Sequence, residues 1–180
     1  MPGASVLPEM KYYKKSDRKT PRRVIILGRE NGGPYRGQYN APGDKYDAKQ
    51  DGKFRHDHGD GTHTLRPNLF NTAVRETKEE IGIQKIINSI GLPRPPSVRV
   101  GGTQVWHVRV PTGVSRTDFR PTPEMSRMEF IDLSLLIDQV RNLGSGHIGA
   151  IQAKTIDGIL VTVSLYVVQI TQEMIRKGFF

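Results

Sequence analysis

The segment from Asn68 to Gly82 constrains the fold of this chain more than any other part of the sequence. One set of its residues recurs at the i, i+3, i+4 and i+7 spacing of a single buried helix face: Leu69, Phe70, Ala73, Val74, Thr77 and Ile81. Pro67 suits the opening of a helix, because its missing N–H is not needed in the first turn. We therefore predict a helix over about 68–80 that ends near Gly82.

The same segment carries three carboxylates within five residues, Glu76, Glu79 and Glu80. Their spacing of one helical turn predicts that they project from the face opposite the apolar one. Carboxylates crowded in this way repel one another, and a hard divalent cation such as Mg²⁺ relieves the repulsion. The alternative is an ordinary solvated helix face, on which Arg75 pairs with Glu79.

The order of residues from Arg75 to Ile83 favours the metal site. It resembles the second half of the Nudix hydrolase signature, Arg-Glu-U-x-Glu-Glu-x-Gly-U, in which U is a bulky aliphatic residue. Every fixed position of that half is present, and Thr77 is an unusual residue at a U position.

Further similarity lies on both sides of this helix. The apolar run 24–27 precedes the segment 37–45, which resembles the family's Gly-x-Trp-x-x-Pro-Gly-Gly, with Tyr39 in place of Trp and Asp44 in place of the second Gly. The segment 128–133 is similar to a late strand and helix of the family. The first half of the signature departs from the pattern: an insertion covers about 45–66, and Pro67 stands where the first Glu is expected.

The resemblance implies an α/β fold, a Nudix-like α/β/α sandwich with a mixed β-sheet. It implies that Glu76, Glu79 and Glu80 hold Mg²⁺ or Mn²⁺, and that Glu76 also orients or deprotonates the attacking water. Arg75 is expected to fix the glutamates through a salt bridge. A further catalytic carboxylate beyond the helix is expected from either Glu129 or Glu124.

Substrate contacts are expected from Arg23, Tyr39 and Gly43. The implied activity is hydrolysis of a diphosphate linkage in a nucleoside diphosphate derivative, with capped RNA or a dinucleoside polyphosphate favoured by the basic character of the chain. The alternative is a catalytically weak or inactive module of the same fold that binds RNA or a ribonucleoprotein partner.

Composition sets further expectations. The 180 residues fit one domain, with a net charge of +9, no cysteine and no apolar run long enough for a membrane span. We expect no membrane association and no secretion, but a reducing intracellular compartment such as the cytoplasm. Basic residues crowd the segment 11–23, which predicts a loose leader over 1–22, ahead of a Nudix domain over 23–180. That leader either binds nucleic acid or touches nothing.

The remaining segments predict alternating strands and helices. Strands are expected at 23–28, 38–41, 83–90 and 128–131, a hairpin over 98–110 that turns at Gly101-Gly102, and helices over 133–143 and 156–177. The histidines between His56 and His63 allow a transition-metal site, although solvated loop residues are the commoner case.

Overall fold

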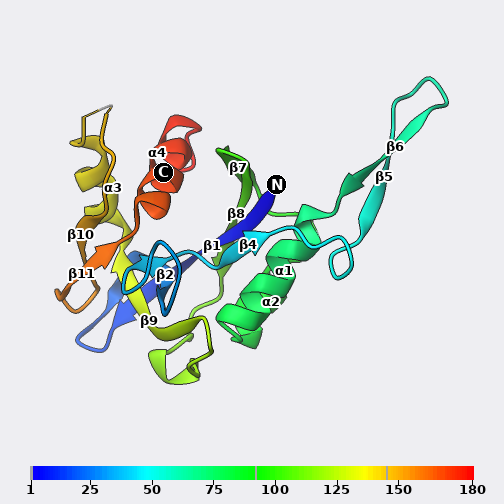
Figure 1. Cartoon of the computed structure of the whole chain (residues 1–180). Coiled ribbons are helices and arrows are strands. Elements are labelled where there is room, and N and C mark those ends of the chain that lie inside the picture. Colours follow the sequence, from blue (N-terminus) through cyan, green and yellow to red (C-terminus); the bar gives the residue numbers. More distant parts are fainter. Residues whose placement is uncertain (1, 92, 145) are drawn as a thin grey trace.

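The computed structural model describes residues 2–91, 93–144 and 146–180. A mixed β-sheet forms its centre and helices lie on both faces (Figure 1). The strands of this sheet are β1 (Gly3–Lys14), β2 (Asp17–Glu30), β3 (Tyr39–Asn40), β4 (Gly43–Lys45), β7 (Ser97–Val100), β8 (Thr103–Val110), β9 (Met125–Asp132), β10 (Ile151–Lys154) and β11 (Leu160–Val163). The helices are α1 (Leu69–Glu80), α2 (Gln84–Ser89), α3 (Leu133–Arg141) and α4 (Leu165–Arg176).

The two longest strands, β1 and β2, form the middle of the sheet. The order across the sheet is β10-β11-β3-β2-β1-β8-β7, with β9 paired to β2 and β4 paired to the start of β1. The β1–β8 and β11–β3 pairs are parallel, and the other pairs are antiparallel.

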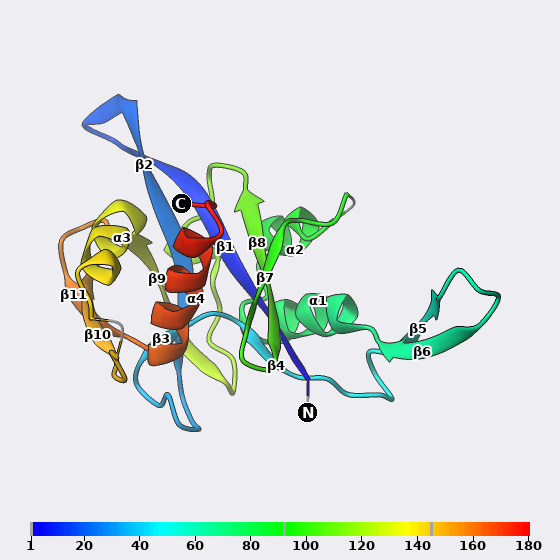
Figure 2. The same cartoon turned by 90° about the horizontal axis from the view of Figure 1, so that it is seen from above.

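Alternation along the central strands divides the core into two layers. Val24 and Ile26 of β2 pack on one face of the sheet with α1 and α2, whereas Ile25 and Leu27 pack on the other face with α3 and α4. Figure 2 shows the same arrangement from above, with α1 and α2 on one side of β1 and with α3 and α4 on the other. The predicted α/β/α sandwich with a mixed sheet is therefore confirmed.

Helix α1 begins and ends as the sequence predicts. The side chain of Asn68 caps it by accepting a hydrogen bond from the N–H of Asn71 at 3.3 Å. Gly82, at φ +66°, adopts the left-handed conformation that ends a helix without strain. Thr77 is fully buried, and its hydroxyl donates to the carbonyl of Ala73 at 2.7 Å, which satisfies its polar group inside the core.

The predicted loose leader is wrong. Residues 3–10 are buried in β1, between β2 and β8, and residues 11–23 continue the β1–β2 pair outward as a hairpin. The basic side chains hid this strand, because they occupy its exposed outer half while Val6 and Leu7 fill the core at its inner half.

Two other segments also differ from prediction. Residues 84–89 form α2 instead of a strand, and Ile86 packs beneath it in the α1 layer. The predicted helix over 156–177 is correct only for α4, because residues 160–163 form β11 and pair with a strand, β10, that was not predicted. The spacing of the β-branched residues here is compatible with a helix or a strand, and pairing with β10 and β3 makes residues 160–163 a strand. The hairpin at Gly101-Gly102, strand β9 and helix α3 confirm the predictions.

The polar insertion contains a separate two-stranded arm, β5 (Lys53–Asp57) and β6 (His63–Pro67). It projects from the body beside α1 in both views (Figures 1 and 2). Its histidines are not part of any metal-compatible cluster among the described residues. Among those residues there is also no helix with the length and apolarity needed to cross a membrane.

Candidate functional site

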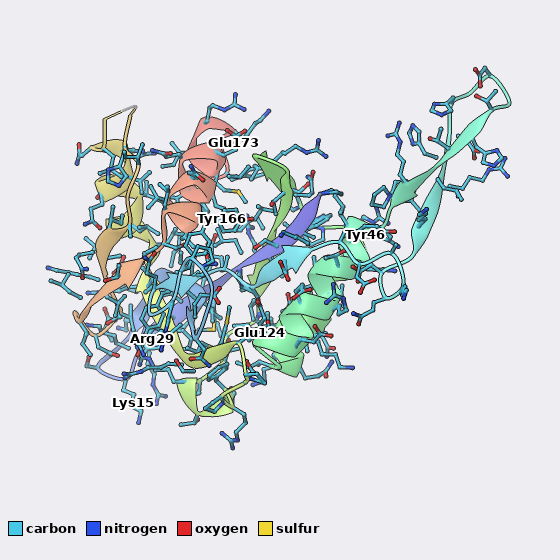
Figure 3. All side chains as sticks on the ribbon, viewed as in Figure 1. Lys15, Arg29, Tyr46, Glu124, Tyr166 and Glu173 are labelled. Carbon is cyan, nitrogen blue, oxygen red and sulfur yellow. The ribbon has the colours of Figure 1, made fainter. Side chains whose placement is uncertain are left out.

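Three carboxylates from two parts of the chain converge beside the sheet. They belong to Glu76 and Glu80 of α1 and to Glu124, which lies in the loop before β9. One oxygen from each lies within 4.8 Å of the others. Glu124 is labelled in Figure 3, where its loop lies next to α1.

The loop that carries Glu124 is tied to its neighbours. The N–H of Asn31 donates to the carbonyl of Glu124 at 2.8 Å, and the Asn31 side chain donates to the carbonyls of Thr122 and Pro123 at 3.2 Å. The Thr122 hydroxyl accepts the N–H of Met125 at 2.9 Å. These bonds fix the position of Glu124 opposite the helix.

Burial makes the cluster electrostatically unfavourable without a cation. Glu76 and Glu80 are 3% and 4% exposed, whereas Glu124 is exposed. Burial raises the pKa of Glu80 to about 10, against one hydrogen bond from the N–H of Gly43 at 2.7 Å. Burial also raises the pKa of Glu76 to about 7, with Arg75 opposing the shift and Asp44 and the neighbouring glutamates adding to it.

This donor set fits a hard divalent cation. The converging groups are carboxylate oxygens, which Mg²⁺ and Mn²⁺ prefer as ligands. Because burial raises the pKa of Glu80 and a bound cation favours its charged form, we expect binding of an ion to release protons from the site.

The acidic cluster lies at one side of a cleft of about 660 Å³, a size typical of small-molecule sites. Glu30, Asp44, Glu80 and Glu124 line the cleft, and Lys45 is the basic residue in its wall. In a chain of net charge +9, this concentration of acidic groups is local, and it gives the cleft a negative charge suited to a cation.

The opposite wall of the cleft is aromatic. Tyr35 and Tyr166 stack with ring centroids 6.5 Å apart and 20° between their planes. Tyr166 lies at the start of α4 (Figure 3), and its buried hydroxyl faces the side chains of Ser5 and Thr103 but makes no hydrogen bond of ordinary geometry among the described residues. Burial raises the pKa of Tyr166 to about 12, so the hydroxyl keeps its proton and can act as a donor.

Glu30 extends the acidic side of the cleft from the end of β2. Its carboxylate accepts a hydrogen bond from the side-chain amide of Asn40 at 3.0 Å. The side-chain oxygen of Asn40 in turn accepts one from the hydroxyl of Ser164, the N-cap residue of α4, at 2.8 Å. Burial raises the pKa of Glu30, and the charges of Glu124 and Asp44 add to the shift. These bonds link Glu30 at the cleft to the N-terminus of α4.

Arg75 occupies the place beside the cluster that the resemblance implies. It donates to buried Asp51 at 2.8 and 3.1 Å and to Glu79 at 3.1 Å, and it contacts Glu76. Glu79 lies outside the group of converging carboxylates. It precedes Glu80 by one residue, and the rotation of the helix per residue turns its side chain toward solvent, where it is 47% exposed.

Of the other predicted site residues, only Gly43 lines the cleft. Glu129 is buried in ion pairs with Arg116 at 2.7 Å and Arg127 at 3.4 Å, outside the acidic cluster. Glu124, the rival candidate, takes part in the cluster instead.

Arg23 and Tyr39 are also not among the residues that line the cleft. Arg23 pairs with Glu9 at 2.7 Å, and its guanidinium covers the ring of Phe180. Tyr39 is 5% exposed and packs in the core layer of α3 and α4. Pairing and packing therefore account for both residues, and the expectation that they contact substrate has no support in the geometry.

Sequence reasoning missed Glu30, Asp51, Tyr35 and Tyr166. Tyr35 carried a partial signal, since it lies in the Gly-rich turn before the family-like segment. The other three lie far from the signature in sequence and reach the site only through the sheet or through α1.

Comparison with solved structures identifies the fold. The chain is similar to a MutT/nudix family protein from Enterococcus faecalis, with TM-score 0.50, 13% identity and coverage of 98% of this chain and 63% of that one. It is also similar to a bifunctional NMN adenylyltransferase/ADP ribose pyrophosphatase from Francisella tularensis, complexed with AMP and a Mn ion, with TM-score 0.53, 12% identity and coverage of 97% and 41%. The chain thus spans less than two thirds of either protein. No protein-family profile and no curated protein matches the sequence.

Proposed function

From the Nudix fold of this chain and the carboxylates that converge at its cleft, we propose that it is a divalent-cation-dependent hydrolase of a diphosphate linkage in a nucleoside diphosphate derivative. The observation that carries the proposal is the approach of Glu76, Glu80 and Glu124 within 4.8 Å at the edge of an acidic cleft. Two of these groups are buried, and a buried anionic cluster is costly unless a cation occupies it.

Each part of the cleft has a role in such a reaction. Glu76, Glu80 and Glu124 would hold Mg²⁺ or Mn²⁺, which supplies positive charge against the phosphate oxygens and acidifies water. Glu76, whose pKa is raised to about 7 by burial, is suited to accept a proton near neutral pH. Arg75 keeps the α1 carboxylates in place through its bonds to Asp51 and Glu79.

The aromatic wall suits the nucleoside end of the substrate. Tyr35 offers a ring face on which a base can stack, and Tyr166 offers a buried hydroxyl donor. The volume of the cleft, about 660 Å³, accommodates one nucleoside diphosphate derivative.

A substrate panel tests the activity. ADP-ribose, diadenosine tetraphosphate, a capped dinucleotide and a nucleoside triphosphate are incubated with the protein and Mg²⁺ or Mn²⁺, and products are separated by chromatography. We expect a nucleoside monophosphate from at least one of them, and no product after chelation of the metal. Absence of product with all four, together with no calorimetric heat on titrating either ion, would contradict the proposal. Tight RNA binding that is insensitive to chelator would then favour the non-catalytic binding module.

Replacement of Tyr35 tests the position of the base. In Tyr35→Ala we expect KM for the substrate that the panel identifies to rise about tenfold or more with kcat nearly unchanged, because stacking contributes about 1–3 kcal/mol per base. Phosphoribosyl diphosphate, which has no base, should show no such change if it is a substrate. Tyr13→Ala removes a 42% exposed tyrosine away from the cleft and serves as the matched control. An equal rise of KM in both variants would exclude Tyr35 as the stacking residue.

A further inference from the structure

The outer half of the β1–β2 hairpin, residues 11–23, projects beyond the sheet, and we name it the basic ribbon. Its two strands pair only with each other among the described residues, in the register Lys11↔Arg23, Tyr12↔Arg22 and Lys14↔Asp17. Strand β8 ends opposite Met10, and β9 ends opposite Val24. Both edges of the basic ribbon are therefore free of neighbouring strands, and Figure 2 shows it leaving the body at the upper left, away from the β5–β6 arm.

Positive charge covers this ribbon on both strands. Its exposed cations are Lys11, Lys15, Arg18, Lys19 and Arg22, of which Arg22 also pairs with Asp132 at 3.5 Å. Its one acidic residue, Asp17, is used inside the turn, where its carboxylate accepts the N–H groups of Lys19 at 3.0 Å and Thr20 at 3.2 Å. Lys15, labelled in Figure 3, lies at the turn and marks the end of the ribbon.

Protection of a free strand edge explains only part of this pattern. Lysines on exposed edges do prevent strands of different molecules from pairing. Isolated charges are sufficient for that purpose, whereas here cations occur in adjacent pairs, at 14–15, 18–19 and 22–23, and give the ribbon a local excess of like charge. A polyanion would relieve the repulsion.

The shape of the ribbon selects among polyanions. A two-stranded β-ribbon fits the major groove of B-form DNA, which is bordered by a row of phosphates on each side. Both strands bear exposed cations, Lys11 on β1 and Arg18 and Lys19 on β2, and Lys15 lies at the turn between them, so the ribbon can meet both rows. A flat membrane surface would contact only one face, and the major groove of duplex RNA is too narrow and deep to admit the ribbon.

We propose that the basic ribbon is a binding site for double-stranded DNA that engages the phosphates on both sides of the major groove. The site lies at the opposite end of β1 from the cleft, which Gly3 lines. Binding of DNA at the ribbon therefore does not depend on the hydrolase activity at the cleft.

Fluorescence anisotropy with a labelled DNA duplex tests the site. With about four phosphate contacts, the affinity of the wild-type protein should fall on the order of a hundredfold between about 50 and 200 mM salt. The variant Lys11→Gln/Lys15→Gln/Arg18→Gln/Lys19→Gln should bind at least about tenfold more weakly at low salt, and its salt slope should be smaller by roughly one for each cation removed.

A control variant with the same loss of charge distinguishes an effect of the ribbon's own cations from an effect of the protein's net charge. Lys49→Gln/Lys53→Gln/Arg55→Gln/Arg66→Gln removes four exposed cations from the β5–β6 arm and the turn before it, and it should keep wild-type affinity and salt slope. Equal weakening in both variants would overturn the proposal, as would absence of duplex binding. Stronger binding to single strands, to duplex RNA or to anionic phosphatidylserine vesicles would overturn it as well.

Discussion

Glu80→Gln is expected to lower kcat for metal-dependent hydrolysis by about a thousandfold. Glu80 is the most buried acidic side chain that lines the cleft, and its oxygen is one of the three that converge. Loss of one anionic ligand removes several kcal/mol of charge stabilisation, and each 1.36 kcal/mol is a factor of ten in rate. The amide is similar in size to the carboxylate and retains an oxygen that can accept the N–H of Gly43, so the fold should persist.

Stability gives an independent readout for the same variant. Since burial raises the pKa of Glu80 to about 10, a neutral side chain suits this position at least as well as a carboxylate in the absence of metal. Without added metal, we expect the urea concentration at the midpoint of unfolding to be equal to or higher than that of the wild type for Glu80→Gln. A residue retained at a cost in stability is typical of a functional site.

Two further glutamates provide controls. Glu173→Gln removes a carboxylate on α4 that pairs with Arg176 outside the cleft, and its kcat should equal that of the wild type. Glu79→Gln should lower kcat less than Glu80→Gln, because Glu79 faces Arg75 and solvent. A greater loss in Glu79→Gln than in Glu80→Gln would favour Glu79 as a metal ligand, as the resemblance implies, and would contradict the geometry.

Asp51→Ala is expected to lower the free energy of unfolding by about 3 kcal/mol, because it removes the buried partner of Arg75 and leaves the guanidinium with only Glu76 and the half-exposed Glu79. Asp51 is 1% exposed and accepts hydrogen bonds from Arg75 at 2.8 and 3.1 Å and from the hydroxyl of Thr72 at 2.8 Å. Burial alone would raise the pKa of Asp51, but hydrogen bonds from Arg75, the N–H of Asp47 and Thr72 together lower it. For a chain of this length the melting temperature should fall by about 6–12 °C.

Asp57→Ala is the matched control for this loss. Asp57 also pairs with an arginine, Arg55 at 2.7 Å, but both side chains are more than half exposed on the β5–β6 arm. Exposed pairs contribute little, so the unfolding free energy should change by less than about 1 kcal/mol. If Asp51→Ala and Asp57→Ala destabilise the protein equally, Asp51 does not anchor Arg75 and α1 to the insertion.

The insertion shows why local sequence patterns predicted helix α1 but not Asp51, the buried residue that holds Arg75 of this helix. The periodicity of α1, the cap at Asn68 and the stop at Gly82 are properties of adjacent residues, and all three were predictable. Asp51 lies 24 residues before Arg75 in a segment without hydrophobic periodicity. Its burial depends on how the insertion folds back over α1.

Strand β1 was also not predicted, again because its stability depends on residues that are distant in sequence. Residues 11–23 are basic enough to suggest a loose leader, and this obscured the short apolar segment of β1 before them. The strand is stable because β2, β8 and β4 provide partners on both sides and both core layers pack against it. Pairing of strands distant in sequence has no local signature.

The sequence by itself determined the acidic helix, the mixed α/β order and the resemblance to the Nudix signature, because these depend on spacing along one segment. Only the tertiary structure decided which carboxylates meet. Helical rotation brings Glu76 and Glu80 to the buried side and leaves Glu79 in solvent, and a loop 44 residues beyond Glu80 supplies Glu124. A metal site is a set of distances between side chains, and those distances are set by packing.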